Sequence, residues 1–162
     1  MPLDNPFEKY GIKRVINAAT SITTLGGSIP DQRIFKAMAE AGKAFASIPE
    51  LQVWAGNEIA KATGAEAGLP VASAVCGLQL SAAACMMRGT ELEKYKPLGM
   101  KGWSHITMRL PLHTEGLRTE FIVQSSNRNS YDYSVELAGG RFMEVEPTEE
   151  ALIDAYDQEK TA

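Results

Sequence analysis

The chain has few of the features that mark secreted, membrane or nucleic-acid-binding proteins. It holds only two cysteines, Cys76 and Cys85, which excludes a disulfide framework and predicts a reducing, cytoplasmic location. Its longest apolar run, residues 78–87, is too short to cross a membrane. No stripe of basic residues is present and the net charge is −4, which argues against a general nucleic-acid site.

The rest of the composition is that of an ordinary globular domain. Hydrophobic residues make up 44% of the chain and charged residues 22%. A chain of 162 residues can bury one core of ordinary size. His105 and His113 have neither the spacing nor the neighbours of metal ligands, so no metal site is predicted.

Apolar periodicity divides the chain into helices and short strands, with residues 13–18 extended and residues 20–30 a loop. In residues 97–120 the apolar residues do not recur at the spacing of a helix or a strand. The order strand–helix, repeated three times, predicts an α/β domain with a largely parallel sheet. The predicted helices are residues 5–10, 31–46, 49–63, 76–88, 91–95, 130–138 and 147–156, and the predicted strands are residues 69–72, 121–124 and 141–145.

The turn after the predicted strand 69–72 is the most informative feature. Ser73 is followed by Ala74, Val75 and Cys76, and these small residues open directly into a helix. The first turn of a helix has free N–H groups, its dipole favours an anion, and small side chains let a ligand approach. The turn is therefore a candidate phosphate site, although close packing alone explains many turns of this kind.

Three longer segments carry a family resemblance: residues 10–28 (YGIKRVINAATSITTLGGS), residues 49–73 and residues 120–146. Their order, their spacing and their amino-acid sequences resemble the N-terminal half of the bacterial L-seryl-tRNA(Sec) selenium transferase superfamily. This branch of the fold-type-I enzymes uses pyridoxal 5'-phosphate (PLP) and includes enzymes similar to D-glucosaminate-6-phosphate ammonia lyase. The resemblance covers nearly the whole chain and is weakest over residues 94–115.

The resemblance implies a partial large domain of the PLP-dependent aminotransferase-like fold, a mostly parallel sheet with flanking helices. Residues 1–48 would be the N-terminal segment with the first helices. Residues 49–162 would be the first half of the PLP-binding large domain, in a longer, homo-oligomeric protein. The implied activity is that of a lyase or transferase, by β-elimination or loss of ammonia from an amino acid or amino sugar acid.

The resemblance also assigns site residues. The turn Ser73, Ala74, Val75 and Cys76 matches the segment that holds the PLP phosphate, where the family usually has glycine in place of Ala74. Asn127 stands where the family has a histidine against the pyridine ring, and it cannot stack in the same way.

Four further residues are assigned to the substrate side of the site. Asn17, Gly26 and Gly27 match a segment at the edge of the family's active site, and Arg128 suits a carboxylate or phosphate. Plainer alternatives remain for these residues. The glycine pair can be a tight connection, and Arg128 a surface charge.

No catalytic residue is assigned, because the family's Schiff-base lysine lies downstream of the matching segments. Lys160 falls in an ordinary Lys-Thr-Ala stretch, so the lysine is expected beyond Ala162. Two other functions stay open: a non-catalytic truncated relic, and a small α/β module that binds a phosphorylated ligand.

Overall fold

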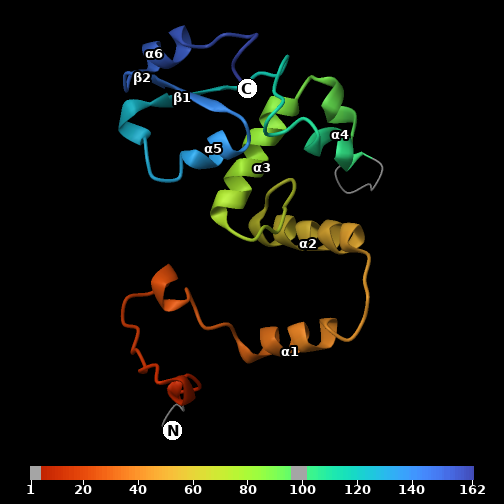
Figure 1. Ribbon diagram of the computed structural model, residues 1–162, viewed down its shortest axis with the longest axis vertical. Coiled ribbons are helices and arrows are strands. Elements are labelled where there is room, and N and C mark those ends of the chain that lie inside the picture. The colour runs from red at the N-terminus through yellow and green to blue at the C-terminus, as the bar shows by residue number, and fades with distance from the viewer. Residues whose placement is uncertain (1–4, 96–101) are drawn as a thin grey trace. The chain divides into compact units, whose positions relative to one another are not determined.

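The computed structural model describes residues 5–95 and 102–162, which belong to two compact units, Met1–Ala46 and Ser47–Ala162 (Figure 1). Six α-helices and a two-stranded parallel sheet are present in the described part. The fold is therefore α/β, as the sequence predicts.

The first unit contains two short 3-10 helices, η1 (Glu8–Tyr10) and η2 (Thr23–Leu25), and the helix α1 (Gln32–Ala41). Asp31 caps α1, because its Oδ1 accepts the N–H of Arg33 at 2.8 Å. The helix ends five residues before the predicted end. Gly42 disfavours its continuation, and Phe45 is fully exposed, so no packing holds a further turn.

The described part of the first unit has no buried residue. The apolar residues of α1 lie open to solvent, with exposed fractions of 50% for Ile34, 44% for Phe35 and 65% for Met38. Residues 13–18, predicted to be extended, pair with no strand in the described part of the chain. This unit is therefore held by local turns and caps.

The second unit begins with α2 (Ile48–Thr63), which ends at Gly64 with φ of 76°, as predicted. Next come α3 (Ala74–Met87) and the 3-10 helix η3 (Glu91–Lys94) at the predicted helical turn. A short helix, α4 (Trp103–Thr107), lies in the stretch for which the sequence showed no period. Residues 97–101 of that stretch lie outside the described residues.

The predicted strand at residues 69–72 is wrong, because the segment is irregular and pairs with no strand in the described residues. A strand needs a neighbour for its backbone groups, and Pro70 has no N–H to donate. Gly68, directly before this segment, instead approaches α2 closely. A Cβ on Gly56 would lie 2.3 Å from the carbonyl oxygen of Gly68, so both positions need glycine.

The sheet consists of β1 (Glu120–Gln124) and β2 (Arg141–Val145), in the register Glu120↔Arg141 to Gln124↔Val145. Figure 1 shows the two strands side by side, joined through η4 (Ser125–Asn127) and α5 (Tyr133–Leu137). The helix α6 (Glu149–Asp154) follows β2. Both strands lie where the sequence predicts them, β1 starting one residue earlier.

The core lies where α3 meets α5 and β1. Ala82 and Met86 of α3 are buried against Ala138, and Phe121 of β1 packs on this cluster. A Cβ on Gly140 would lie 2.7 Å from the Phe121 ring, so glycine allows this packing. The helix α5 begins three residues later than predicted, because the Asn129 side chain accepts the Tyr131 N–H and forms a turn there.

Candidate functional site

The turn from Ser73 to Cys76 has the geometry of a capped helix N-terminus. Ser73 is extended, with φ of −161°, and its Oγ accepts the N–H of Cys76 at 3.2 Å. The Ser73 hydroxyl also lies 3.3 Å from the Cys76 Sγ. The N–H groups of Ala74 and Val75 have no hydrogen-bond partner among the described residues. The turn therefore offers two unengaged amides to an anion.

Ala74 is the first helical residue of α3, so its position does not require glycine. Among the described non-glycine residues, only Thr20 has a positive φ. An alanine therefore fits the backbone of this turn without strain.

Asn127 and Arg128 lie at the carboxyl end of β1. Asn127 ends η4 and is exposed, and its Nδ2 donates to the Gln124 Oε1 at 3.3 Å. This end of a parallel strand is where ligands of α/β sheets usually bind.

Arg128 is held by two carboxylates. Its Nε donates to the Asp132 Oδ2 at 2.5 Å and its Nη1 to the Glu144 Oε2 at 2.9 Å. Its guanidinium lies 5.2 Å from the centroid of the Phe142 ring. The hydrogen bond to Asp132 raises the pKa of Arg128 above its usual value. The side chain thus ties the start of α5 to β2 through two of its five N–H groups.

Asn17, Gly26 and Gly27 belong to the first unit, where they form tight turns. The Asn17 Nδ2 donates to the Thr20 carbonyl at 2.7 Å, and its Oδ1 accepts the Ala19 N–H at 2.9 Å. Gly26 and Gly27 have φ of 86° and 76°, with nothing within 4 Å of an added Cβ. The glycines serve the backbone conformation, in keeping with a tight connection.

In the described residues, no hydrogen bond or ion pair links the turn at Ser73–Cys76 to Asn127 or Arg128. Within the same part of the chain, no group of three or more His, Cys, Asp or Glu side chains is arranged to hold a metal ion. His105 instead stacks on Tyr95, with ring centroids 4.3 Å apart. None of the helices in residues 5–95 and 102–162 is long and apolar enough to span a bilayer.

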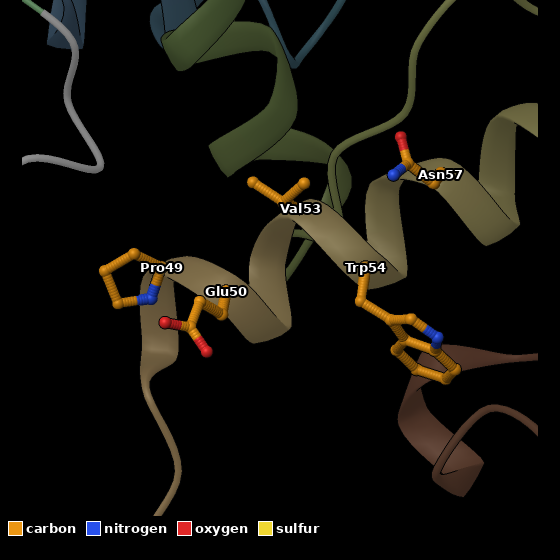
Figure 2. Close-up of a pocket in the computed structure, with 5 residues that line it drawn as sticks. All are labelled: Pro49, Glu50, Val53, Trp54 and Asn57. Atoms are coloured by element: carbon orange, nitrogen blue, oxygen red, sulfur yellow. The ribbon is translucent and has the colours of Figure 1, made fainter.

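The helical spacing of residues 51, 54, 55, 59 and 62 predicts a buried apolar face that includes Trp54. The structure instead has a shallow hollow on α2 at this residue, which sequence reasoning missed. Trp54 is 62% exposed and lines this hollow. Figure 2 shows that all its lining residues come from one helix, so the hollow has a wall on one side only. The lining residues are Pro49, Glu50, Val53, Trp54 and Asn57.

Comparison with known proteins relates the chain to two enzymes. It is 28% identical over 144 residues to 5'-C-glycyluridine monooxygenase-decarboxylase from a Streptomyces species, an alignment covering 86% of this chain and 33% of that protein. It is 26% identical over 165 residues to D-glucosaminate-6-phosphate ammonia lyase from Salmonella typhimurium, covering 98% of this chain and 41% of the lyase. The chain thus spans between a third and about two fifths of these relatives. No family model matches it.

Proposed function

We propose that the chain is the N-terminal part of a PLP-dependent lyase or transferase, with residues 49–162 as the first half of its large domain. The reaction would be β-elimination or loss of ammonia, and we favour an ammonia-lyase type acting on an amino acid or amino sugar acid. Two findings support this: the motif resemblance, and the similarity over 98% of the chain to a protein named as an ammonia lyase. The observation that carries it is the Ser73 turn, with its two unengaged amides.

The residues of this turn suit the phosphate of PLP. The Ala74 and Val75 N–H groups point out of the first turn of α3, and the Ser73 hydroxyl lies beside them. The 14-residue helix behind them adds a favourable dipole for an anion. When bound, PLP supplies an electron sink for a carbanion at the substrate α-carbon.

Asn127 and Arg128 would serve the other side of the cofactor. The Asn127 amide, at the carboxyl end of β1, is free enough of packing to lie against a ring face. Arg128, clamped by Asp132 and Glu144, would fix the loop that carries Asn127. Asn17, Gly26 and Gly27 would shape the edge of the substrate site.

The lysine that binds PLP covalently is proposed to lie outside this chain. A Schiff-base lysine needs a lowered pKa so that its amine is neutral. Lys160 has the opposite environment, because its hydrogen bond to Asp157 at 3.0 Å raises its pKa. We therefore assign catalysis to a longer, homo-oligomeric protein that includes this chain.

The decisive experiment replaces Ser73 by Ala in that longer protein. The change removes a hydrogen bond to a charged phosphate, worth about 1.5–3 kcal/mol. PLP affinity should fall roughly ten- to a hundredfold, measured by cofactor dissociation followed by absorbance. Ser47→Ala is the matched control, because Ser47 precedes α2 without a side-chain cap and should leave affinity unchanged. Unchanged affinity in Ser73→Ala would place the phosphate elsewhere.

A second experiment uses the 162-residue chain itself. Mixed with PLP and treated with borohydride, it should give only slow, scattered lysine adducts, detected by peptide mass spectrometry. A stoichiometric adduct at one lysine would show that this chain carries its own Schiff-base residue.

A further inference from the structure

The segment between α1 and α2 contains two residues with an open backbone. On the side of α1, the Ala44 N–H still donates to a carbonyl of the helix at 3.4 Å. On the side of α2, the Ser47 carbonyl accepts an N–H of that helix at 3.0 Å. Among the described residues, none donates to or accepts from the backbone N–H and C=O groups of Phe45 and Ala46. These two residues can therefore form backbone hydrogen bonds to another molecule.

The side chain of Phe45 sets this segment apart from the rest of the chain. It is fully exposed, and its neighbours Ala44, Ala46 and Ser47 have small side chains. Every other aromatic residue lies in a helix or a strand, or donates its backbone N–H to a hydrogen bond. The segment thus combines one large, accessible aromatic ring with an open backbone and small flanking residues.

This combination is what an endoprotease recognises. An extended peptide is bound through main-chain hydrogen bonds, and pockets for its side chains give specificity. In proteases of the chymotrypsin kind, a hydrophobic slot takes the side chain that precedes the cleaved bond. Exposed loops with small residues are also the sites at which proteolytic nicking concentrates. Phe45 fits such a slot, and Ala46 and Ser47 place no bulky group after the bond.

We propose that the peptide bond between Phe45 and Ala46 is a processing site for an endoprotease with an aromatic-binding pocket, and that the cut leaves residues 46–162 folded. The step is a hydrolysis in which water is the co-reactant. The C–N bond breaks, Phe45 gains a new carboxyl terminus and Ala46 gains a new amino terminus. The inference is independent of the proposed PLP chemistry.

The position of the bond decides what the cut releases. The first compact unit ends at Ala46 and the second begins at Ser47, so the bond lies one residue before this boundary. Within residues 5–95 and 102–162, every buried residue lies after Ser47, and the core cluster of α3, α5 and β1 belongs wholly to the larger product. The larger product should therefore keep its core. The first 45 residues, held by local turns and caps, should be degraded further.

The test digests the full 162-residue chain with a trace of chymotrypsin and follows the products by intact mass. The first products should be residues 1–45 and 46–162, and the larger should survive at least about ten times longer than the intact chain. Phe45→Ala should slow the first cut at least about tenfold, because the slot loses its side chain. Phe35→Ala is the matched control. Phe35 is also exposed, but its backbone is bonded within α1, so this variant should be cut at the original rate.

Four results would overturn the proposal. They are a first cut at any other residue, equal rates of the first cut in the two variants, a larger product digested as fast as the intact chain, and protection of Phe45 in a dimer isolated by size exclusion. The last result would assign Phe45 to an interface between copies of the chain. Both variants change an exposed side chain, so neither should prevent folding. None of these readouts involves PLP, so the Ser73 test can fail independently.

Discussion

The helices α1 and α3 are both capped at their N-termini, but they differ in how far their apolar side chains are buried. Asp31 caps α1 and Ser73 caps α3, each through a hydrogen bond to a backbone N–H. Met38 of α1 is nevertheless 65% exposed, whereas Met86 of α3 is fully buried. A cap and an apolar pattern are therefore enough to start a helix, but a core forms only where segments distant in the sequence pack against that helix.

In the second unit, packing between segments distant in the sequence depends on glycines at close contacts. Gly139 has φ of 95°, and a Cβ there would lie 2.4 Å from the Pro111 carbonyl oxygen. Gly26, in the first unit, has a similar φ of 86° but open space around it. The two glycines share a positive φ and differ in their surroundings.

The largest expected effect comes from Gly139→Ala compared with Gly26→Ala. At Gly139 the methyl group adds a backbone clash to the left-handed strain, for a loss of about 3–5 kcal/mol in the free energy of unfolding. At Gly26 only the strain remains, about 1–2 kcal/mol. Urea denaturation followed by circular dichroism measures both. Equal losses would show that the second unit is as loosely packed as the first.

A smaller contrast is expected from truncating the two methionines. Met86→Ala should destabilise the protein by about 2–4 kcal/mol, because it leaves a cavity between α3 and α5. Met38→Ala should change stability by less than about 0.5 kcal/mol, since its side chain is largely exposed. Thermal unfolding of the two variants gives the comparison. A large loss at Met38 would mean that α1 is covered in solution.

The smallest effect concerns pH and the cap of α1. The hydrogen bond from the Arg33 side chain, followed by that from its N–H, lowers the pKa of Asp31. A lowered pKa in the folded state means that the cap stabilises α1 fully above the unfolded pKa of about 3.9 and is lost as pH falls through the folded pKa.

NMR chemical shifts of residues 32–41 should therefore report less helix below about pH 4. Asp31→Asn is the control, because Asn also caps a helix but does not titrate. In this variant the helix content of α1 should not fall below about pH 4. An α1 whose shifts stay constant through the acid range in the original chain would show that Asp31 does not hold the helix.

Local signals made much of the fold predictable. The strand at Arg141–Val145 matches its prediction because a short segment with three apolar residues, Phe142, Met143 and Val145, lies between Gly140 and Pro147. Gly64 ends α2 as predicted, whereas α3 starts at Ala74, two residues before its predicted start, because the Ser73 side chain caps it there. These features depend on neighbours in sequence, which one chain displays directly.

The wrong predictions concern features that depend on residues distant in the sequence. Residues 69–72 have strand-like composition but no strand beside them, and Trp54 has an apolar pattern but no covering wall. For the candidate site, the sequence located the turn before a helix at Ser73 but gave no sign that Ser73 caps that helix or that Asp132 and Glu144 would hold Arg128. Glu144 lies 16 residues away and reaches Arg128 only because β2 pairs beside β1.

The exposed indole on α2 decides which spectroscopic methods will be informative. The sequence has two tryptophans, and Trp54 and Trp103 are 62% and 51% exposed. Their emission in the folded chain should already resemble that of indole in water, so a fluorescence melt would record little when the core opens. The same property makes Trp54 a reporter of contact. Anything that covers the hollow on α2 should move its emission to shorter wavelength and shield it from soluble quenchers.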